Sequence, residues 1–315
     1  MTLKKTAVST GAALGLLLLA EQATRVALFG AGAFSVRRLH SERGAEILRA
    51  SAVPGLALEL PPGLDAEFKG VPLRANALGM ADEERTPAKP RGAFRIAVLG
   101  DSYSTPWGVP REQGWVSRLQ GSLREDGARV EVLDFAVPGY GPEEYAAVLE
   151  RKALAFAPDL VLVGWCGEND HLEGNGKAFA ELYRERRGDG LKASYLADWL
   201  RTAWRAEAPR PRYTPAERAF VSRELAALRS LAGKVPLVVV QLGMRDPRSA
   251  ELGELVAGAG ARFLDAGAPF FGKPLRPWTL NALDLHPNAA AHEVYAREIA
   301  GWLRAERLVP IKGRD

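Results

Sequence analysis

The chain has 315 residues, of which 47% are hydrophobic and 25% are charged, a mixture that can fold around one sizeable core and excludes a disordered chain. Its net charge of +4 comes from scattered basic residues, so we predict no nucleic-acid partner. The single cysteine, Cys166, excludes an internal disulfide, and the four histidines lack the spacing of a zinc site, so we predict no metal.

The N-terminal segment, residues 1–36, has the charged-then-apolar order of an export signal. Lys4 and Lys5 precede the run TAVSTGAALGLLLLA, and VALFGAGAF continues it beyond Glu21 and Arg25. The first run is short for a span of about 20 residues, but both runs together suffice if Glu21 and Arg25 pair or reach the interface. We expect an uncleaved membrane anchor preceding an exported domain. The alternatives are a cleaved signal peptide, cut near the small triplet AGA, and a buried amphipathic helix.

Residues 37–92 are interrupted by polar residues, proline and glycine, as in PPG and TPAKPRG. This composition predicts a connector that packs on the main domain. Its only strand signal is a short pair around AEFKGVPLRA.

From residue 93 onward, short apolar runs alternate with helical periodicity, which is the pattern of βαβ units and a parallel sheet. The runs are β-branched and nearly continuous, as expected of strands that are buried on both faces. We therefore predict five parallel strands: FRIAVLG (94–100), VEVLDFAV (130–137), LVLVGW (160–165), VPLVVVQL (235–242) and ARFLDA (261–266).

Helices are predicted between these strands. One presents an apolar face beginning at Trp115, a second begins at Pro142, and a third begins after Thr214, which a proline and then a glutamate follow as in a capping box. A final helix follows Asn288, its expected cap.

The long crossover at about 167–234 must hold an insertion of extra helices. Within it, four large residues recur at near-helical spacing, and they form either a lid or substrate wall or an ordinary core stripe. They are Leu191, Tyr195, Trp199 and Trp204.

Chemically useful side chains follow four of the predicted strands. GDS follows the first strand, PGYG the second, GEND the third, and DLHPN comes after the fifth. Ligands of a parallel sheet bind at the carboxyl ends of its strands, so we expect these four loops to meet at one site.

Together the four loops supply the parts of a serine hydrolase. Ser102 would be the nucleophile, His286 the base that takes its proton, and Asp284 the acid that orients the base. The backbone N–H groups of Ser102 and Gly139 and the side-chain amide of Asn169 would form the oxyanion hole. Glycine suits its position because the backbone must approach the substrate closely.

With these blocks, GDSYS, VPGYGP, GEND and DLHPN in that order, the chain resembles the GDSL-type or SGNH hydrolases over residues 93–306. The resemblance implies an α/β fold, a three-layer α/β/α flavodoxin-like sandwich, and hydrolysis of carboxylic esters without a cofactor. It leaves residues 307–315 as a tail. The N-terminal hydrophobic helix precedes this fold.

Two positions depart from the family pattern. The family acid usually lies three residues before the histidine, where this chain has Leu283, and Asp284 is only two before it. A loop of different curvature would bring Asp284 to the imidazole. Otherwise Asp265, Asp246 or a dyad supported by a backbone carbonyl would take that role. Pro106 stands where many relatives carry glycine, which stiffens the loop.

Each of these residues taken singly has a structural interpretation as well. Ser102 alone would be a turn or cap residue, Gly139 a turn glycine and Asn169 a helix cap, so their roles rest on the constellation. The remaining candidates are assigned structural roles: Asp101 braces its loop, Cys166 is a small buried hydrophobe, and His171 and His292 are structural or wall residues.

The chain also lacks a glycine-rich dinucleotide loop after a strand and a phosphate-binding loop. We therefore expect an exported, membrane-anchored serine esterase without cofactor, whose substrates are acyl esters such as those on envelope or extracellular polysaccharide. The alternatives are acyl transfer to a sugar hydroxyl by the same triad and a non-catalytic binding protein that retains the fold.

Overall fold

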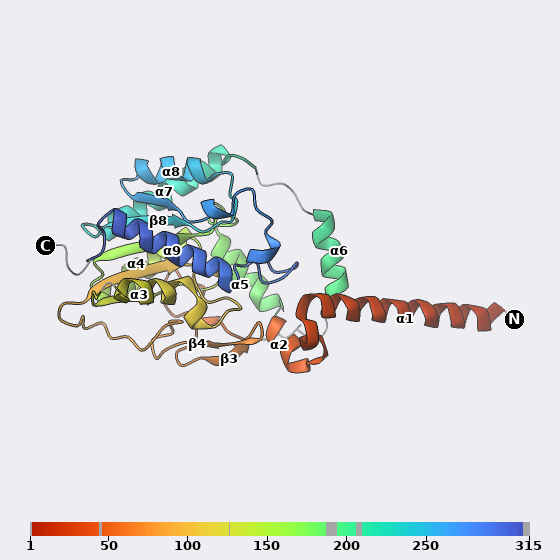
Figure 1. Ribbon diagram of the computed structural model, residues 1–315. Coiled ribbons are helices and arrows are strands. Elements are labelled where there is room, and N and C mark those ends of the chain that lie inside the picture. Colours follow the sequence, from red (N-terminus) through yellow and green to blue (C-terminus); the bar gives the residue numbers. More distant parts are fainter. Residues whose placement is uncertain (1, 44–45, 126, 187–193, 206–209, 311–315) are drawn as a thin grey trace.

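The computed structural model describes residues 2–43, 46–125, 127–186, 194–205 and 210–310. A layered body holds most of the chain, and one long N-terminal helix projects from it (Figure 1).

The body is built on a five-stranded parallel sheet in the order β6-β5-β7-β8-β9. This order confirms the flavodoxin-like fold: the first strand of the sheet lies inside it, and the chain goes to one edge and then returns to build outward on the other side. The strand bounds are β5 (Phe94–Gly100), β6 (Val130–Asp134), β7 (Leu160–Trp165), β8 (Leu237–Gln241) and β9 (Arg262–Asp265).

The second, fourth and fifth strands are shorter than predicted. β8 begins after Pro236, which has no N–H to give to a ladder. β6 ends at Asp134, although the chain beyond it still follows β5 through the bonds from Phe135 N to Val98 O and from Val137 N to Gly100 O.

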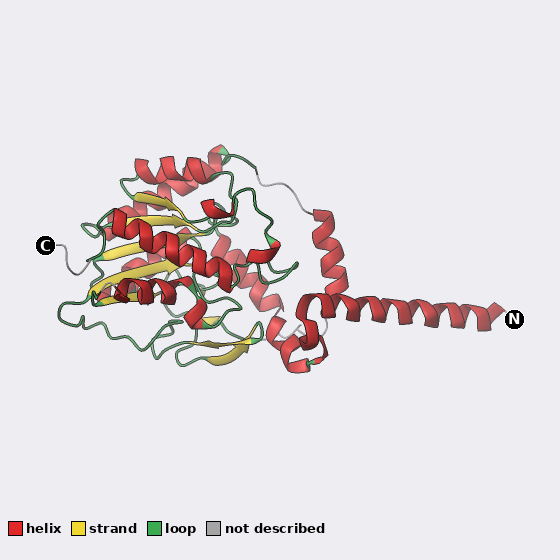
Figure 2. Cartoon of the chain, in the orientation of Figure 1, coloured by secondary structure: helices red, strands yellow, loops and turns green. Residues whose placement is uncertain are grey.

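Helices cover both faces of the sheet (Figure 2). The helices of the body are α3 (Trp115–Glu125), α4 (Pro142–Arg151), α5 (Asn175–Arg186), α7 (Pro215–Ala232), α8 (Ser249–Gly258) and α9 (Ala289–Ala305). Short 3-10 turns are η2 (Arg111–Gln113), η3 (Ala153–Phe156), η4 (Ala268–Phe270) and η5 (Arg276–Trp278).

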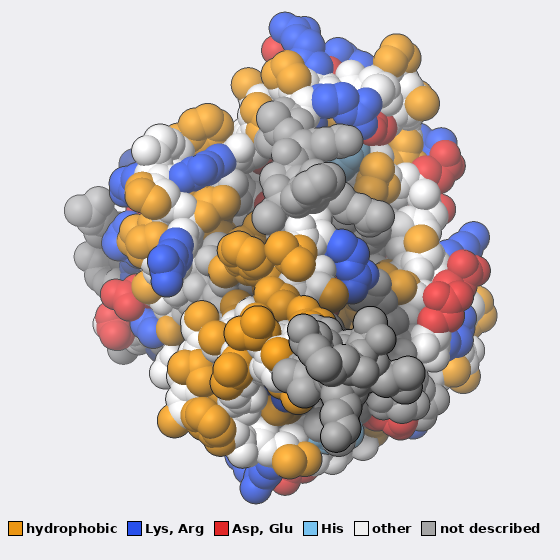
Figure 3. All heavy atoms as spheres, turned by 90° about the vertical axis from the view of Figure 1, so that its right-hand side faces the viewer, with side chains coloured by type: hydrophobic (Ala, Val, Ile, Leu, Met, Phe, Trp, Pro, Cys, Tyr) orange, Lys and Arg blue, Asp and Glu red, His pale blue; other side chains and the backbone are white. Residues whose placement is uncertain are grey.

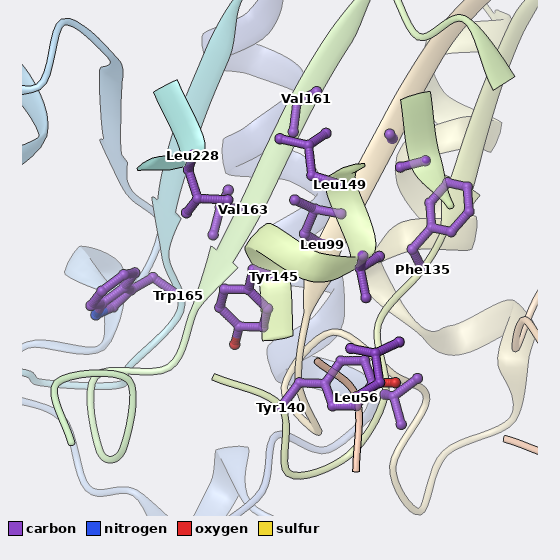
Figure 4. Packing of buried hydrophobic residues seen from close by; sticks show 14 of the residues in the cluster. Leu56, Leu99, Phe135, Tyr140, Tyr145, Leu149, Val161, Val163, Trp165 and Leu228 are labelled. Atoms are coloured by element: carbon purple, nitrogen blue, oxygen red, sulfur yellow. The ribbon is translucent and has the colours of Figure 1, made fainter. Parts of the chain in front are cut away.

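Alternating strand residues divide the core into two halves. Ile96, Val98 and their neighbours pack against α3 and α9 on one face. Ala97 and Leu99 pack on the other face against α4, α7 and α8, where Figure 4 shows Leu99, Leu149, Val161 and Leu228 within one cluster. The sheet is therefore apolar on both sides, which explains why its strands are continuous hydrophobic runs.

Two helix starts have the expected caps. Thr214 Oγ1 accepts a hydrogen bond from Glu217 N at 3.3 Å while the Glu217 carboxylate accepts from Thr214 N at 2.7 Å, completing a capping box. Asn288 Oδ1 accepts from the backbone N–H groups of Ala290 and Ala291 at the start of α9.

The segment before the sheet contains the expected strand pair and a second, shorter pair. β3 (Asp65–Phe68) and β4 (Val71–Arg74) form an antiparallel hairpin, and β1 (Arg49–Ala50) pairs with β2 (Leu58–Glu59). The hairpin turn is Lys69-Gly70, with φ of 53° and 80°, the doubly positive conformation of a two-residue turn that matches strand twist.

A buried arginine ties this segment to the sheet. Arg95 on β5 pairs with Glu131 and donates to the carbonyl oxygens of Thr86, Pro87 and Ala88, while its side chain is only 1% exposed. The chain just before the sheet is therefore held by the sheet itself.

The N-terminal segment consists of α1 (Thr2–Phe29), η1 (Gly30–Phe34) and α2 (Val36–Arg43). The stretch Thr10–Phe34 is long and apolar enough to cross a membrane, by length and composition. Its described side chains are largely exposed, so the interpretation as a buried amphipathic helix is wrong. Glu21 and Arg25 form the expected pair at 2.8 Å.

Within the described residues, the aromatic stripe of the insertion contributes neither to the pocket described below nor to the main core. In α6 (Tyr195–Arg205), Tyr195 is buried against Phe29 of α1, with ring centroids 5.1 Å apart, whereas Trp199 is exposed. Leu191 and the Trp204 side chain lie outside the described part of the chain. The spacing of the large residues predicted a helix, but it could not indicate that this helix packs against α1.

Candidate functional site

The loops at the carboxyl ends of the strands surround a pocket of about 460 Å³. The lining combines polar groups of the predicted site with apolar side chains: Lys69, Ser102, Tyr103, Trp107, Cys166, Glu168, Asn169, Leu283, Asp284, Leu285 and His286. The structure thus brings Ser102, Asn169, Asp284 and His286 to one pocket.

Ser102 sits in a tight turn that starts directly after β5. Asp101 O accepts from Ser104 N and Thr105 N, so the chain turns sharply as soon as the strand ends. This turn places Ser102 Oγ at 2.8 Å from His286 Nε2. Its side chain is only 8% exposed, so the hydroxyl is approached from the pocket and not from open solvent.

The loop before α9 has a curvature that brings Asp284 to His286. Asn281 Oδ1 accepts from the backbone N–H groups of Leu283 and Asp284, which closes a local turn. Asp284 Oδ1 then accepts from His286 N and lies 2.5 Å from His286 Nδ1. A turn of this curvature lets an aspartate two residues before the histidine reach the ring, while Leu283 lines the pocket.

The other acids considered from the sequence have different partners. Asp265 accepts a hydrogen bond from Ser249 Oγ, and Asp246 is paired with Arg248 at 2.9 Å. Neither contacts His286, so among the three carboxylates the geometry selects Asp284.

The sequence analysis missed Lys69, which lies at the tip of the β3–β4 hairpin. Its Nζ lies 2.6 Å from Asp284 Oδ2 and 3.2 Å from a Glu42 oxygen. Burial alone would lower the pKa of Lys69, but the negative charges of Asp284 and Glu42 outweigh it and raise that pKa. The only local signal was the Lys-Gly turn, which indicates a hairpin but says nothing of what the lysine contacts.

Asp284 is consequently held in its ionised form. Burial alone would raise the pKa of Asp284, but the hydrogen bond and charge of His286, with the charge of Lys69, bring it well below the ordinary range. Trp107 completes this environment: its indole N–H donates to Asp284 Oδ2 at 3.2 Å, and its ring stacks on the imidazole with centroids 4.6 Å apart.

Two backbone N–H groups of the predicted oxyanion hole are unused. Within the described residues, neither Ser102 N nor Gly139 N has a hydrogen-bond acceptor. Gly139 has a φ of 82°, and a Cβ there would lie 1.9 Å from the Phe179 ring, so both conformation and space call for glycine. However, Gly139 lines a separate small hollow, which Phe179 also lines, and not the pocket itself.

Asn169 lines the pocket, and its side-chain amide donates to Asp101 Oδ2 at 3.4 Å. An amide NH₂ carries two hydrogens, so one remains for a substrate oxygen. Asp101 is fully buried, and its other oxygen accepts from Tyr103 N at 2.8 Å, in the bracing role expected of it. Burial raises the pKa of Asp101 to about 6.

The other candidates have structural surroundings. Cys166 is buried, and burial raises the pKa of its thiol well above the usual value. His171 contacts the Arg248 guanidinium, and His292 accepts from Trp115 N inside the body. In the described part of the chain, no group of three or more His, Cys, Asp or Glu residues could hold a metal ion.

Two curated esterases are similar to part of the chain. The chain is 34% identical over 87 residues to an arylesterase of Vibrio mimicus and 30% identical over 109 residues to esterase TesA of Pseudomonas aeruginosa. These stretches cover 28% and 33% of this chain and only 43% and 54% of the two relatives.

Two solved structures of esterases match about two thirds of this chain. A crystal structure of TesA matches with a TM-score of 0.44 and 20% identity, over 68% of this chain and 99% of that one. A single-residue variant of Axe2, an acetyl xylan esterase from Geobacillus stearothermophilus, matches with a TM-score of 0.44 and 15% identity, over 70% of this chain and 97% of that one.

The sequence model of the GDSL-like lipase/acylhydrolase family matches residues 98–294, from the end of β5 to the first turns of α9. This stretch is over half of the chain and contains all four sequence blocks, three of which contribute residues to the pocket. The chain therefore belongs to the GDSL-like lipase/acylhydrolase family.

Proposed function

We propose that this protein is a serine hydrolase that cleaves carboxylic esters through Ser102, His286 and Asp284. The observation that carries the proposal is the unbroken chain of contacts from Ser102 Oγ to His286 Nε2 at 2.8 Å and from His286 Nδ1 to Asp284 at 2.5 Å. These are the contacts that an activated serine requires.

The proposed reaction begins when His286 Nε2 takes the Ser102 proton as Oγ bonds to the ester carbonyl carbon. The carbonyl oxygen becomes negatively charged and accepts from the N–H groups of Ser102 and Gly139 and from Asn169 Nδ2. The imidazolium then gives its proton to the leaving alcohol oxygen as the C–O bond breaks, which leaves an acyl-serine. Water, deprotonated by His286, attacks this ester, and the proton returns to Ser102 Oγ as the acid departs.

Asp284 has two roles in this scheme. It holds the ring in the tautomer with the proton on Nδ1, so that Nε2 is free to accept, and it stabilises the imidazolium. Because the pKa of Asp284 is held below the ordinary range, the carboxylate stays charged throughout the neutral pH range.

The proposed substrates are short acyl esters. Trp107, Leu283 and Leu285 supply apolar wall to a pocket of about 460 Å³, a volume at the small end for ligand sites. We further propose that α1 anchors the protein with its hydrolase domain outside the cytoplasm. Acyl groups on envelope or extracellular polysaccharide would then be within its reach.

The proposal also divides the chain into four segments. Residues 1–36 form the anchor, 37–92 a connector packed on the main domain, 93–306 the hydrolase domain with its insertion at about 167–234, and 307–315 a tail. The bonds from Arg95 to residues 86–88 support the packing of the connector.

A fluorophosphonate probe tests the proposal. The wild-type protein should be labelled and should hydrolyse short p-nitrophenyl esters, and Ser102→Ala should abolish both. Ser104→Ala is the matched control: this serine lies in the same turn, is buried, and has no partner for its hydroxyl among the described residues, so labelling should persist.

Other outcomes distinguish the alternatives. Folded wild-type protein that is neither labelled nor active on any ester of the panel would be a non-catalytic binding protein, and the proposal would be wrong. Labelling with acyl transfer to an added sugar acceptor in place of hydrolysis would assign the same triad to an O-acyltransferase.

A further inference from the structure

Helix α6 is held by the N-terminal helix through a cap and a ring contact. Glu21 of α1 accepts hydrogen bonds from Ser194 Oγ at 2.8 Å, Tyr195 N at 3.1 Å and Leu196 N at 2.9 Å, so its carboxylate caps the start of α6. The Tyr195 ring packs edge-on against Phe29. The first turn of α6 is therefore bound to the C-terminal third of α1, through Glu21 and Phe29.

This cap limits how far α1 can lie in hydrocarbon. Glu21 and Arg25 pair with one another and contact α6, so both charges are satisfied by protein groups at that level. Up to Ala20 the described side chains of α1 instead face outward, and Leu14 and Leu16–Leu19 are all more than half exposed. From Thr2 to Ala20 the helix rises about 27 Å, close to a hydrocarbon core of about 30 Å. Such a span would begin before the apolar stretch Thr10–Phe34 and would include Lys4 and Lys5 near its outer end, where long cationic side chains reach the interface.

α6 also presents an apolar face without cover in the described structure. Trp199 and Leu200 follow Tyr195 and Leu196 by one turn, so they continue the same side of the helix, yet they are 47% and 48% exposed. Arg201, paired with Asp198, lies on the opposite side. The helix is thus amphipathic, with tryptophan on its apolar face, as is typical of helices that lie in a membrane interface.

The positions of α1 and α6 in space agree with an interfacial location of α6. In Figure 1, α6 runs across the direction of α1, begins beside the inner part of α1 and lies on the side of the body from which α1 projects. Figure 3 views the side from which α1 projects and shows hydrophobic side chains gathered near its centre. A bilayer around α1 would reach α6 at its surface, and α6 would lie along that surface.

We propose that α6 is an interfacial helix whose Trp199 and Leu200 enter the headgroup boundary of the bilayer that α1 crosses, with the hydrocarbon ending at Ala20. The inference rests on the proposed membrane anchor. It assigns to the insertion a membrane-binding role, and it fixes the level of the hydrolase domain above the bilayer through the Glu21 cap.

Site-specific fluorescence of the full chain in phosphatidylcholine/phosphatidylglycerol vesicles tests this placement. In a Cys166→Ala background, an environment-sensitive probe is attached at Leu200→Cys or, as matched control on the opposite, polar side, at Arg201→Cys. Lipids carrying a nitroxide near the headgroup should quench the probe at 200 at least threefold more than the probe at 201, and emission at 200 should be shifted to the blue.

A third variant tests the cap. Glu21→Gln removes the charged acceptor, so quenching at 200 should fall toward the level at 201, while the chain stays in the vesicles after a carbonate wash. Equal quenching at 200 and 201 in a retained wild-type chain overturns the inference and leaves the anchor intact. A probe at 200 that is shielded from both water and lipid also overturns it, because protein would then cover the face. Release of the chain by carbonate overturns the anchor and, with it, this inference.

Discussion

Asp284 lies between the His286 imidazole and the Lys69 ammonium, and its replacement by asparagine tests the acid of the proposed triad. Its two oxygens lie 2.5 Å from His286 Nδ1 and 2.6 Å from Lys69 Nζ. Asp284→Asn removes the charge that stabilises the imidazolium. Loss of the acid in a Ser-His-Asp site lowers kcat by about 10⁴-fold, which corresponds to about 5 kcal/mol.

The lysine makes the expected loss larger. Without Asp284, the Lys69 ammonium, only 14% exposed, faces the imidazolium without that counter-charge. At a separation of roughly 6 Å and an effective dielectric constant of about 20, the repulsion adds up to about 3 kcal/mol. We therefore expect kcat/KM of Asp284→Asn to fall by at least about 10⁴-fold.

A double variant separates the two effects. Lys69→Met in the wild-type background should lower kcat/KM modestly, whereas in the Asp284→Asn background it should raise kcat/KM by about tenfold or more, because it removes the repulsion. The assay is hydrolysis of p-nitrophenyl acetate by protein whose folding is checked by circular dichroism. Asp65→Asn, an exposed carboxylate on the same hairpin as Lys69, is the control. Activity of Asp284→Asn within tenfold of wild type, or an equal effect of Lys69→Met in both backgrounds, would refute the reasoning.

Three further predictions concern the fold around the site. Gly139→Ala should lower the free energy of unfolding by about 2 kcal/mol, measured in urea, because it places a Cβ at positive φ and against the Phe179 ring; an unchanged midpoint contradicts this. Arg95→Met should cost about 3 kcal/mol in the same assay, since it leaves Glu131 and several carbonyl oxygens without their donor; a loss below about 1 kcal/mol would mean that these bonds hold the connector only weakly. Burial lowers the pKa of His292 from 6.5 to about 3, so the unfolded chain takes up a proton that the folded protein refuses, and stability is lost as pH falls below about 6.5. Between pH 7 and pH 5 the wild type should lose about 2 kcal/mol more than His292→Gln, and parallel curves would show that this histidine does not titrate on unfolding.

The elements that the sequence predicted well are those whose signal is local. The run FRIAVLG is apolar throughout most of its length because β5 is covered on both faces, and the prediction and the structure agree on residues 94–100. The Thr214 and Asn288 caps could be recognised because a cap involves residues only two or three positions apart. Strand ends were predicted less well: β6 ends at Asp134, although the apolar run and two backbone hydrogen bonds to β5 continue to Val137.

The meeting of three of the four loops at one pocket could be predicted because parallel strands end at one edge of a sheet. That rule brings Ser102, Asn169 and His286 to one pocket without knowledge of any loop. This rule does not indicate which carboxylate reaches His286, because Asp284, Asp265 and Asp246 all lie in the sequence at or after the end of a predicted strand. The contact of Asp284 with His286 depends on the turn that Asn281 closes.

The sequence by itself determined the α/β class, the five strands, the residues at the strand ends and the apolar N-terminal helix. Each of these depends on the hydrophobic periodicity, the helix caps or the order of residues that are neighbours in the chain. Only the tertiary structure decided that Lys69 reaches Asp284 and that Glu21 caps α6. Both contacts join segments that are far apart in the chain. They depend on the path of turns such as Lys69-Gly70, where no periodicity indicates which distant group a side chain will meet.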